Sequence, residues 1–205
     1  MANKKIAIIL KSPEFCETVT EDTVIYADAA LNHAEKVGKK KILAVVGDFD
    51  SLGYTPNGIN IVGLNVEKDF TDGERAIHLA VEQGYKDITI YGAYGGKIEH
   101  VLGNIALLKI AKNLGANAVI KHGDNVTELL GDSAVLSVEK ESTLSIIPYG
   151  ERCEFIKSSG LYYPLDNLVL TNADTRGISN QTTEQEVRIE IKKGEALVIY
   201  GRKSK

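Results

Sequence analysis

The spacing of apolar residues divides this chain into two parts with different architectures. Up to about residue 122, short β-branched runs alternate with stretches whose apolar residues recur at helical spacing. Strand, helix and strand in repetition predict an α/β domain with a mostly parallel sheet covered by helices. From residue 127 onward the apolar runs shorten and turn residues separate them, which predicts an all-β domain of the sandwich or barrel type. We therefore expect two domains, residues 1–122 and 123–205.

The same spacing predicts the individual elements. In the first part we expect strands at Ile6–Leu10, Thr23–Ala27, Ile42–Val46, Asn60–Leu64, Ile88–Tyr91 and Ala118–Lys121, and helices at Ala29–Val37, Asp72–Gln83 and Glu99–Asn113. In the second part we expect strands at Thr127–Leu130, Ala134–Glu139, Thr143–Pro148, Glu154–Lys157, Leu168–Thr171, Glu186–Ile191 and Ala196–Tyr200. The segment Lys192-Lys193-Gly194-Glu195 is typical of a hairpin loop between the last two strands.

Composition limits the kinds of partner that we expect. The chain has 24 Lys and Arg against 28 Asp and Glu, so its net charge of −4 lacks the basic field of a nucleic-acid binder. No apolar run approaches the roughly 18 residues needed to span a membrane, and the N-terminus, in which only Ile6–Leu10 follow Met-Ala-Asn-Lys-Lys, is too short for a signal peptide. Cys16 and Cys153 have no metal-binding spacing and favour a reducing compartment. We expect a cytoplasmic protein that binds neither nucleic acid nor a membrane.

Acidic residues follow three of the predicted strands. Asp28 comes directly after the second strand, Asp48 and Asp50 lie in the segment Gly47-Asp48-Phe49-Asp50-Ser51, and Asp69 and Asp72 lie in Lys68-Asp69-Phe70-Thr71-Asp72. The carboxyl ends of parallel strands meet at one edge of a sheet, where α/β proteins bind ligands. Clustered carboxylates repel one another unless a cation neutralises them, and their oxygens suit Mg²⁺ together with phosphates. The pattern therefore predicts a metal–phosphate site and metal-assisted phosphoryl transfer.

Each acidic segment also has a purely structural interpretation. Thr71-Asp72-Gly73-Glu74 fits a capping box, in which Thr71 is the N-cap, Glu74 reaches back and Asp72 faces the helix dipole. Asp28 fits an N-cap as well, and Asp48 and Asp50 fit a turn. Capping alone does not explain why acidic residues recur after three separate strands, so the joint pattern favours the metal–phosphate site.

A glycine-rich segment, Gly92-Ala93-Tyr94-Gly95-Gly96-Lys97, follows the fifth predicted strand and leads into a helix. It is no P-loop, because Tyr91 and Ile98 stand where that motif needs glycine and Ser or Thr. A phosphate could still approach its backbone, with Lys97 as the counter-charge; the alternative is a flexible turn with a solvated lysine. His100 and Asn104 are four residues apart and share a helix face, where a lone histidine is often structural.

Together these segments resemble the thiamine pyrophosphokinase family over nearly the whole chain. Gly47–Ser51 matches the family motif G-D-x-D-S, and Lys68–Asp72 matches K-D-x-T-D. Asp28 occupies the place of the aspartate in D-G-[AG], and Gly96–His100 is similar to G-R-x-D-H. In the second part, residues 160–165 resemble G-[LF]-x-[YW]-x-L and residues 176–180 resemble G-x-S-N. The order of the two domains is also that of the family.

The resemblance implies transfer of the β,γ-pyrophosphoryl group of ATP to thiamine, giving thiamine diphosphate and AMP, by a Mg²⁺-dependent homodimer with thiamine near the subunit interface. It implies that Asp48, Asp50 and Asp72 hold the metal and organise phosphate, and that Asp50 or Asp72 accepts the hydroxyl proton. Lys97 and His100 would stabilise charge on the transferred group. Lys68, Asp69 and Thr71 would line the triphosphate, and Tyr163, Ser179 and Asn180 would contact thiamine. The other implied binding residues, without a more specific role, are Asp28, Ser51, Glu74, Gly96 and Glu99.

Three residues depart from the family pattern. Ala29 replaces a glycine, Lys97 replaces an arginine and loses its bidentate geometry, and Glu99 replaces an aspartate. Two other functions therefore stay open at this point. One is a related pyrophosphokinase for another small alcohol, such as a pterin, and the other is a sensor that binds nucleotide or thiamine without catalysis.

Overall fold

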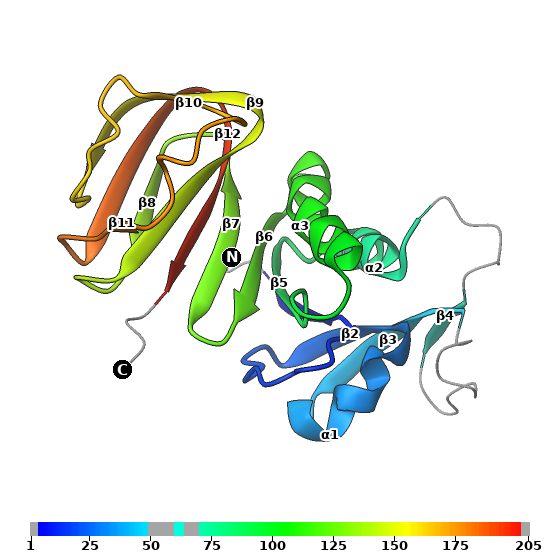
Figure 1. Ribbon diagram of the computed structural model, residues 1–205. Helices are drawn as coiled ribbons and strands as arrows, with labels where there is room; N and C mark the ends of the chain where they lie inside the picture. The colour runs from blue at the N-terminus through cyan, green and yellow to red at the C-terminus, as the bar shows by residue number, and fades with distance from the viewer. Residues whose placement is uncertain (1–3, 49–59, 64–69, 202–205) are drawn as a thin grey trace. The chain divides into compact units, whose positions relative to one another are not determined.

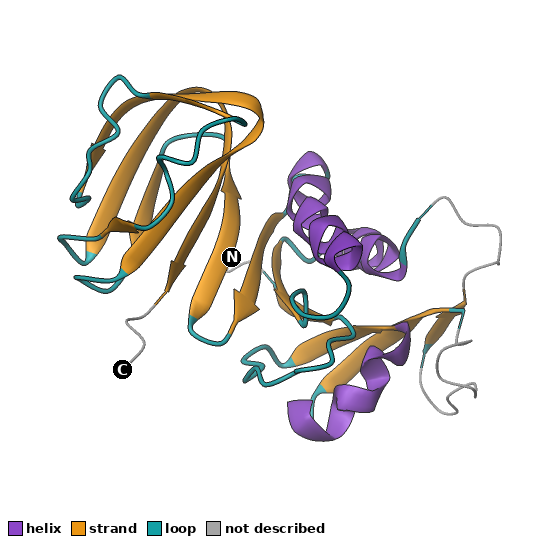
Figure 2. Ribbon diagram, viewed as in Figure 1, coloured by secondary structure: helices purple, strands orange, loops and turns teal. Residues whose placement is uncertain are grey.

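The computed structural model describes residues 4–48, 60–63 and 70–201 of the chain, which divides into two compact units, Met1–Gly123 and Asp124–Lys205 (Figure 1). The first unit combines strands with helices, and the second is built from strands (Figure 2). The predicted change from an α/β to an all-β architecture is thus confirmed.

The first unit is built on a parallel sheet in the order β6-β5-β1-β2-β3-β4. Its strands are β1 (Lys5–Ile9), β2 (Thr23–Ala27), β3 (Lys41–Gly47), β4 (Ile61–Gly63), β5 (Asp87–Tyr91) and β6 (Asn117–His122). Along β1, Ile6 and Ile8 face one side and Ala7 and Ile9 the other, and all four are fully buried. Burial on both faces explains why these strands are continuous apolar runs without polar alternation.

Helices cover both faces of this sheet (Figure 1). α2 (Asp72–Glu82) and α3 (Ile98–Asn113) pack on one face, and the 3-10 helix η1 (Asp28–His33) followed by α1 (Ala34–Val37) packs on the other. The segment predicted as one helix over Ala29–Val37 is therefore a 3-10 helix with a single α-helical turn after it. α2 and α3 agree with prediction to within a residue at each end.

The order of the strands reverses between β1 and β5. From β1 the chain adds β2, β3 and β4 in one direction, and then β5 and β6 on the opposite side of β1. Such a switch point leaves a crevice at the carboxyl ends of the two strands, where open α/β sheets bind ligands. The loops that follow β1 and β5, beginning at Leu10 and Gly92, therefore border the expected ligand position.

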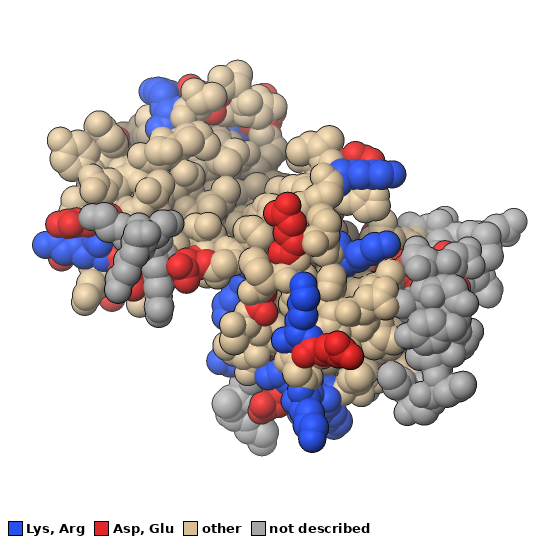
Figure 3. Space-filling model, turned by 60° about the horizontal axis from the view of Figure 1, so that its bottom comes forward, with Lys and Arg blue, Asp and Glu red and all other residues tan. Residues whose placement is uncertain are grey.

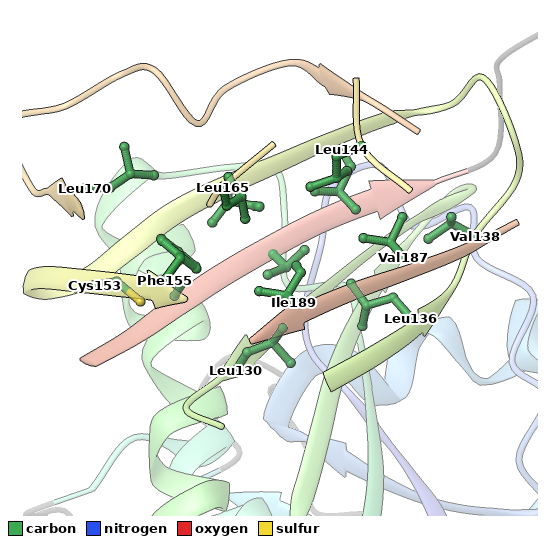
Figure 4. Packing of buried hydrophobic residues seen from close by; sticks show 14 residues of the cluster. Leu130, Leu136, Val138, Leu144, Cys153, Phe155, Leu165, Leu170, Val187 and Ile189 are labelled. Carbon is green, nitrogen blue, oxygen red and sulfur yellow. The ribbon is translucent and has the colours of Figure 1, made fainter. Parts of the chain in front are cut away.

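The second unit is an antiparallel assembly in which β10, β9, β12 and β7 lie side by side, with β11 paired to β9 and β8 paired to β12. Its strands are β7 (Asn125–Leu130), β8 (Ala134–Ser137), β9 (Thr143–Ser159), β10 (Val169–Thr171), β11 (Asn180–Gln181) and β12 (Glu186–Gly201). The two long strands pair along most of their length. Their inward side chains, among them Leu144, Phe155, Val187 and Ile189, form a buried core (Figure 4).

The predicted hairpin loop at Lys192–Glu195 is wrong, because β12 continues through these residues. Its pairing with β9 shifts register between Glu190 and Glu195, as in a β-bulge, which bends the strand without ending it. Gly194 has a φ of +92° and lies so close to β9 that a Cβ atom would collide with the carbonyl oxygen of Arg152. This glycine therefore permits a close approach inside a long strand and not a chain reversal.

The surface carries both signs of charge. On the face shown in Figure 3, acidic and basic side chains are interspersed, as the near balance of 24 basic and 28 acidic residues suggests. Among the described helices, none combines the length and the apolar character that crossing a membrane requires.

Candidate active site

Asp28 stands at the carboxyl end of β2, and its environment is unusual for a carboxylate. The residue is 8% exposed, and its Oδ1 atom is buried without a hydrogen-bond partner among the described residues. Its φ is +45°, a conformation that aspartate and asparagine tolerate better than most residues. The predicted N-cap role is wrong, because Ala27 occupies the N-cap position and Asp28 is the first residue of η1. The carboxylate is thus held at the sheet edge without serving the helix.

Asp48 follows the neighbouring strand, β3, and is exposed at the same edge. β2 and β3 are parallel and pair Ala27 with Val46, so the residues after both strands leave the sheet side by side. Gly47 packs against Asp28: a Cβ on Gly47 would lie 2.8 Å from the Cβ of Asp28. The absence of a side chain at Gly47 is therefore what lets the two acidic segments lie together.

Thr71, Asp72 and Glu74 begin α2. The Thr71 hydroxyl accepts a hydrogen bond from the Glu74 N–H at 3.2 Å, so Thr71 is the N-cap of the helix. Asp72 and Glu74 lie in the first turn and are half-buried. The capping interpretation of Thr71 is confirmed, but an N-cap hydroxyl that accepts one bond keeps a hydrogen to donate.

The glycine-rich loop after β5 is tied to the protein on its inner side. Gly92 has a φ of +71°, and a Cβ there would collide with the carbonyl oxygen of Leu10. Ser12 Oγ donates to the Tyr94 carbonyl at 2.8 Å, and Asn104 Nδ2 donates to the Ala93 carbonyl at 2.9 Å. The loop after β5 and the loop after β1 are therefore packed together at the switch point.

Lys97 is the N-cap residue of α3, and Glu99 and His100 lie in its first turn. All three side chains are exposed, as is Gly96 before them. The interpretation of His100 as a structural, partly buried histidine is therefore wrong. A cationic side chain and an imidazole at a helix start are available to an anionic ligand.

Several predicted residues lie outside the described part of the chain: Asp50, Ser51, Lys68 and Asp69. Within the described part, no three His, Cys, Asp or Glu side chains gather closely enough to hold a metal ion. The structure brings Asp28 and Asp48 to one edge, and among the residues that it describes none donates a hydrogen bond to Oδ1 of Asp28. A buried carboxylate oxygen with unused bonding capacity is the kind of group that binds a hydrated Mg²⁺.

In the second unit, Asn180 holds the backbone of Tyr163. Asn180 Oδ1 accepts from the Tyr163 N–H at 3.0 Å, and Asn180 Nδ2 donates to the Tyr163 carbonyl at 2.7 Å. Asn180 is 5% exposed, whereas Tyr163 is 64% exposed and its ring packs edge to face on that of Tyr162, with 4.9 Å between the ring centroids. Asn180 therefore presents Tyr163 and is occupied by main-chain groups. Ser179 next to it is exposed and has a φ of +58°.

Ser12 was not singled out from the sequence, and Gly92 and Asn104 were noted there without the roles that the structure shows. Ser12 and Asn104 support the glycine-rich loop, and Gly92 makes the close approach to Leu10, directly after β1. The signal for Gly92 was present, since a glycine directly after a buried strand often marks a close backbone contact. Ser12 gave no signal, because its partner Tyr94 lies 82 residues away in the chain.

Comparison with known families gives two matches in the same order as the two units. The family model described as "Thiamin pyrophosphokinase, catalytic domain" matches residues 17–120. The model described as "Thiamin pyrophosphokinase, vitamin B1 binding domain" matches residues 134–195. The first covers Asp28, Asp48 and the glycine-rich loop, and the second covers Tyr163 and Asn180.

Individual proteins agree with this match. Thiamine pyrophosphokinase of Bacillus subtilis (strain 168) is 31% identical over 137 residues, which are 65% of this chain and 63% of that protein. Thiamin pyrophosphokinase 1 of Caenorhabditis elegans is 23% identical over 154 residues, 70% of this chain and 63% of that protein. The chain thus matches slightly less than two thirds of the length of each of these relatives.

Solved structures share the fold over almost the whole chain. The crystal structure of thiamine pyrophosphokinase from Bacillus subtilis superposes with a TM-score of 0.85 at 24% identity, covering 98% of this chain and 100% of that one. Yeast thiamin pyrophosphokinase superposes with a TM-score of 0.76 at 13% identity, covering 98% and 87%. At these identities the likeness concerns the fold.

Proposed function

The chain belongs to the thiamin pyrophosphokinase family, and from that premise we propose that it transfers the pyrophosphoryl group of ATP to the hydroxyl group of thiamine. The products would be thiamine diphosphate and AMP. The observation that carries the proposal is Asp28, whose Oδ1 is buried at the carboxyl edge of the sheet with no protein donor among the described residues. An enzyme that binds a cation and a triphosphate at this edge would use that oxygen.

Asp48, Asp50 and Asp72 would hold Mg²⁺ at the edge of the sheet where Asp28 lies. When bound, Mg²⁺ neutralises charge on the phosphate oxygens, which is the main requirement of phosphoryl transfer. Asp50 or Asp72 would accept the proton of the thiamine hydroxyl, since the reaction needs a base within hydrogen-bond reach. Lys68, Asp69, Thr71, Ser51 and Glu74 would line the triphosphate.

The glycine-rich loop would receive the phosphates of ATP. Its residues Gly96, Lys97, Glu99 and His100 are exposed at the start of α3, where the helix dipole favours an anion. Lys97 and His100 would stabilise charge on the transferred group. Lys97 offers a point charge and not the bidentate fork of the arginine usual in the family, so we expect weaker orientation of the phosphate.

The second unit would bind thiamine. The exposed face of Tyr163 suits the cationic thiazolium ring, because aromatic faces attract cations. Ser179, which is exposed and precedes Asn180 in the chain, would contact the substrate directly. Asn180 would act mainly through Tyr163, because its amide already bonds both main-chain groups of that residue.

We also propose that the protein works as a homodimer with thiamine near the subunit interface, as the family resemblance implies. Its two cysteines are free thiols, which suits the reducing conditions of the cytoplasm. Size-exclusion chromatography with light scattering would test the assembly, and a monomer at micromolar concentration would contradict it.

One incubation tests the reaction. The protein is mixed with ATP, Mg²⁺ and thiamine, and the products are identified by mass. We expect AMP and thiamine diphosphate in equal amounts, and ADP as the main product would contradict the proposal. Faster turnover of another alcohol would favour a related pyrophosphokinase. Asp48→Asn should abolish turnover, whereas Asp132→Asn, which changes an exposed acid of the second unit, should not. A protein that binds ATP without turning it over would be a sensor.

A further inference from the structure

We propose that Ser12 and Asn104 are positioning residues that fix the glycine-rich loop Gly92–Lys97 in the conformation that receives ATP. This inference rests on the proposed function, which assigns the loop to the phosphates. Neither residue belongs to the motifs that indicate the family. Both act on the loop backbone from its inner side, so neither would need to touch the nucleotide.

Ser12 is part of the loop after β1 and is 2% exposed. Its Oγ donates to the Tyr94 carbonyl at 2.8 Å and accepts from the Glu14 N–H at 3.3 Å. Its own N–H donates to Nε2 of His33 at 3.3 Å, and the His33 ring stacks on Phe15 at 4.6 Å. Ser12 is therefore fixed from several directions, and its hydroxyl can hold Tyr94 in one place.

Asn104 acts from the opposite element. It lies on α3, two turns after the loop ends, and its Nδ2 donates to the Ala93 carbonyl at 2.9 Å. The two consecutive carbonyls of Ala93 and Tyr94 are thus bound by side chains from two elements that are far apart in the sequence. A rigid helix and a buried serine together determine how these two peptide planes are turned.

The loop needs such support because its glycines restrict it little. Gly92, Gly95 and Gly96 all have positive φ values, of +71°, +90° and +75°. Glycine loses the most conformational freedom on ordering, so a glycine-rich loop is costly to hold in one conformation. In a trans peptide the C=O and N–H groups point in opposite directions. Binding the Ala93 and Tyr94 carbonyls on the inner side therefore turns the N–H groups of Tyr94 and Gly95 away from Ser12 and Asn104.

Without either side chain the free loop should be less ordered, so ATP binding would have to order it and the affinity for ATP should fall. We expect Ser12→Ala and Asn104→Ala each to raise KM for ATP about fivefold, the size expected for one lost hydrogen bond. KM for thiamine should stay within about twofold, because Tyr163 belongs to the other unit. The double variant should be less than additive, since both bonds fix adjacent peptides.

Two matched controls separate positioning from general destabilisation. Ser142→Ala removes a buried hydroxyl that donates to the Glu139 carbonyl at 2.7 Å in the second unit. Asn60→Ala removes an amide that donates to the Leu43 carbonyl at 3.2 Å in the first unit. Both lose the same kind of bond away from the loop, so they should lower stability without changing KM for ATP.

Steady-state kinetics are combined with amide hydrogen exchange of the peptide spanning residues 92–97 in the absence of nucleotide. We expect faster exchange in Ser12→Ala and Asn104→Ala and unchanged exchange in the controls. If the wild type turns over but these variants behave like the controls in both measurements, the inference is wrong. If the wild type has no turnover, the proposed function fails, while the exchange data still decide whether the two residues hold the loop.

Discussion

Two buried carboxylates flank the same strand and are treated in opposite ways. Glu21 lies just before β2 and Asp28 lies just after it, and each is 8% exposed. Glu21 accepts hydrogen bonds from the Thr89 hydroxyl at 2.6 Å and from the Tyr91 hydroxyl at 2.9 Å. Asp28 Oδ1 accepts none from the described residues. The two carboxylates are thus equally buried, but both oxygens of Glu21 accept hydrogen bonds, whereas Oδ1 of Asp28 accepts none from the described residues.

The difference separates a carboxylate that stabilises the fold from one that serves a ligand. A buried polar group without a partner costs on the order of 1–3 kcal/mol, so a chain keeps one only with compensation. Ligands of parallel sheets bind at the carboxyl edge, where Asp28 lies. We therefore expect Glu21 to matter for stability and Asp28 to matter for activity.

Asp28→Asn should give the largest effect. Asparagine keeps the shape and tolerates the positive φ, but removes the negative charge. We expect a loss on the order of a hundredfold in kcat/KM, as for other groups that stabilise charge in a transition state. The melting temperature should be unchanged or higher, because the substitution removes a buried charge whose Oδ1 atom has no hydrogen-bond partner among the described residues. Kinetics with ATP and thiamine, together with calorimetry, would measure both.

The opposite result for Asp28→Asn would contradict the distinction between Asp28 and Glu21. If Asp28→Asn keeps full activity and melts earlier, then Asp28 is a structural residue like Glu21. Asp132→Asn provides the control, because this exposed acid belongs to the second unit and should change neither quantity.

Glu21→Leu should give the next largest effect, and on stability. It leaves the hydroxyl groups of Thr89 and Tyr91 without their acceptor, which should lower the free energy of unfolding by about 2–3 kcal/mol. Activity measured well below the melting temperature should stay near that of the wild type. Urea denaturation would measure the change, and a variant as stable as the wild type would show that the two hydrogen bonds contribute nothing.

These two carboxylates also show what the sequence could predict. Asp28 was found because position after a strand and a parallel sheet are both visible in local patterns. Glu21 was not found, because its partners lie 68 and 70 residues further along the chain and meet it only when β5 packs beside β1. Local spacing predicts which edge a residue reaches, but not which side chains it meets there.

The same limit applies to the strands of the second unit. Their positions were predicted well, but β9 and β12 were each divided in two at a glycine. A glycine between two apolar runs, such as Gly150 or Gly194, is typical of a turn when only the sequence is known. In the structure these two glycines have φ values of +99° and +92° inside the strands. Whether such a glycine reverses the chain or bends a strand depends on the neighbouring strand, here through the register shifts of β12 against β9.

Tyr91→Phe tests one of the two bonds to Glu21. Burial and the nearby charge of Glu21 raise the pKa of Tyr91 to about 12, so its hydroxyl stays protonated and donates at neutral pH. Its loss should lower the free energy of unfolding by about 1 kcal/mol, because Glu21 keeps its bond from Thr89. Chemical denaturation would measure this, and a loss equal to that of Glu21→Leu would mean that Thr89 adds nothing.

The smallest effect concerns pH. Burial alone would raise the pKa of Glu21, but the hydrogen bonds from Thr89 and Tyr91 and the charge of Lys121 outweigh it, so the pKa lies below the ordinary value of 4.5. The unfolded chain therefore takes up a proton at higher pH than the folded protein, and the stability that Glu21 provides is complete above that ordinary value. As pH falls through the lowered folded pKa, this stability is lost. The difference in unfolding free energy between the wild type and Glu21→Leu should accordingly narrow as the pH falls from 6 toward 3. Ser142→Ala removes no ionisable group, so its difference in unfolding free energy from the wild type should not change with pH. If the difference for Glu21→Leu does not change with pH either, the fold does not favour the charged form of Glu21.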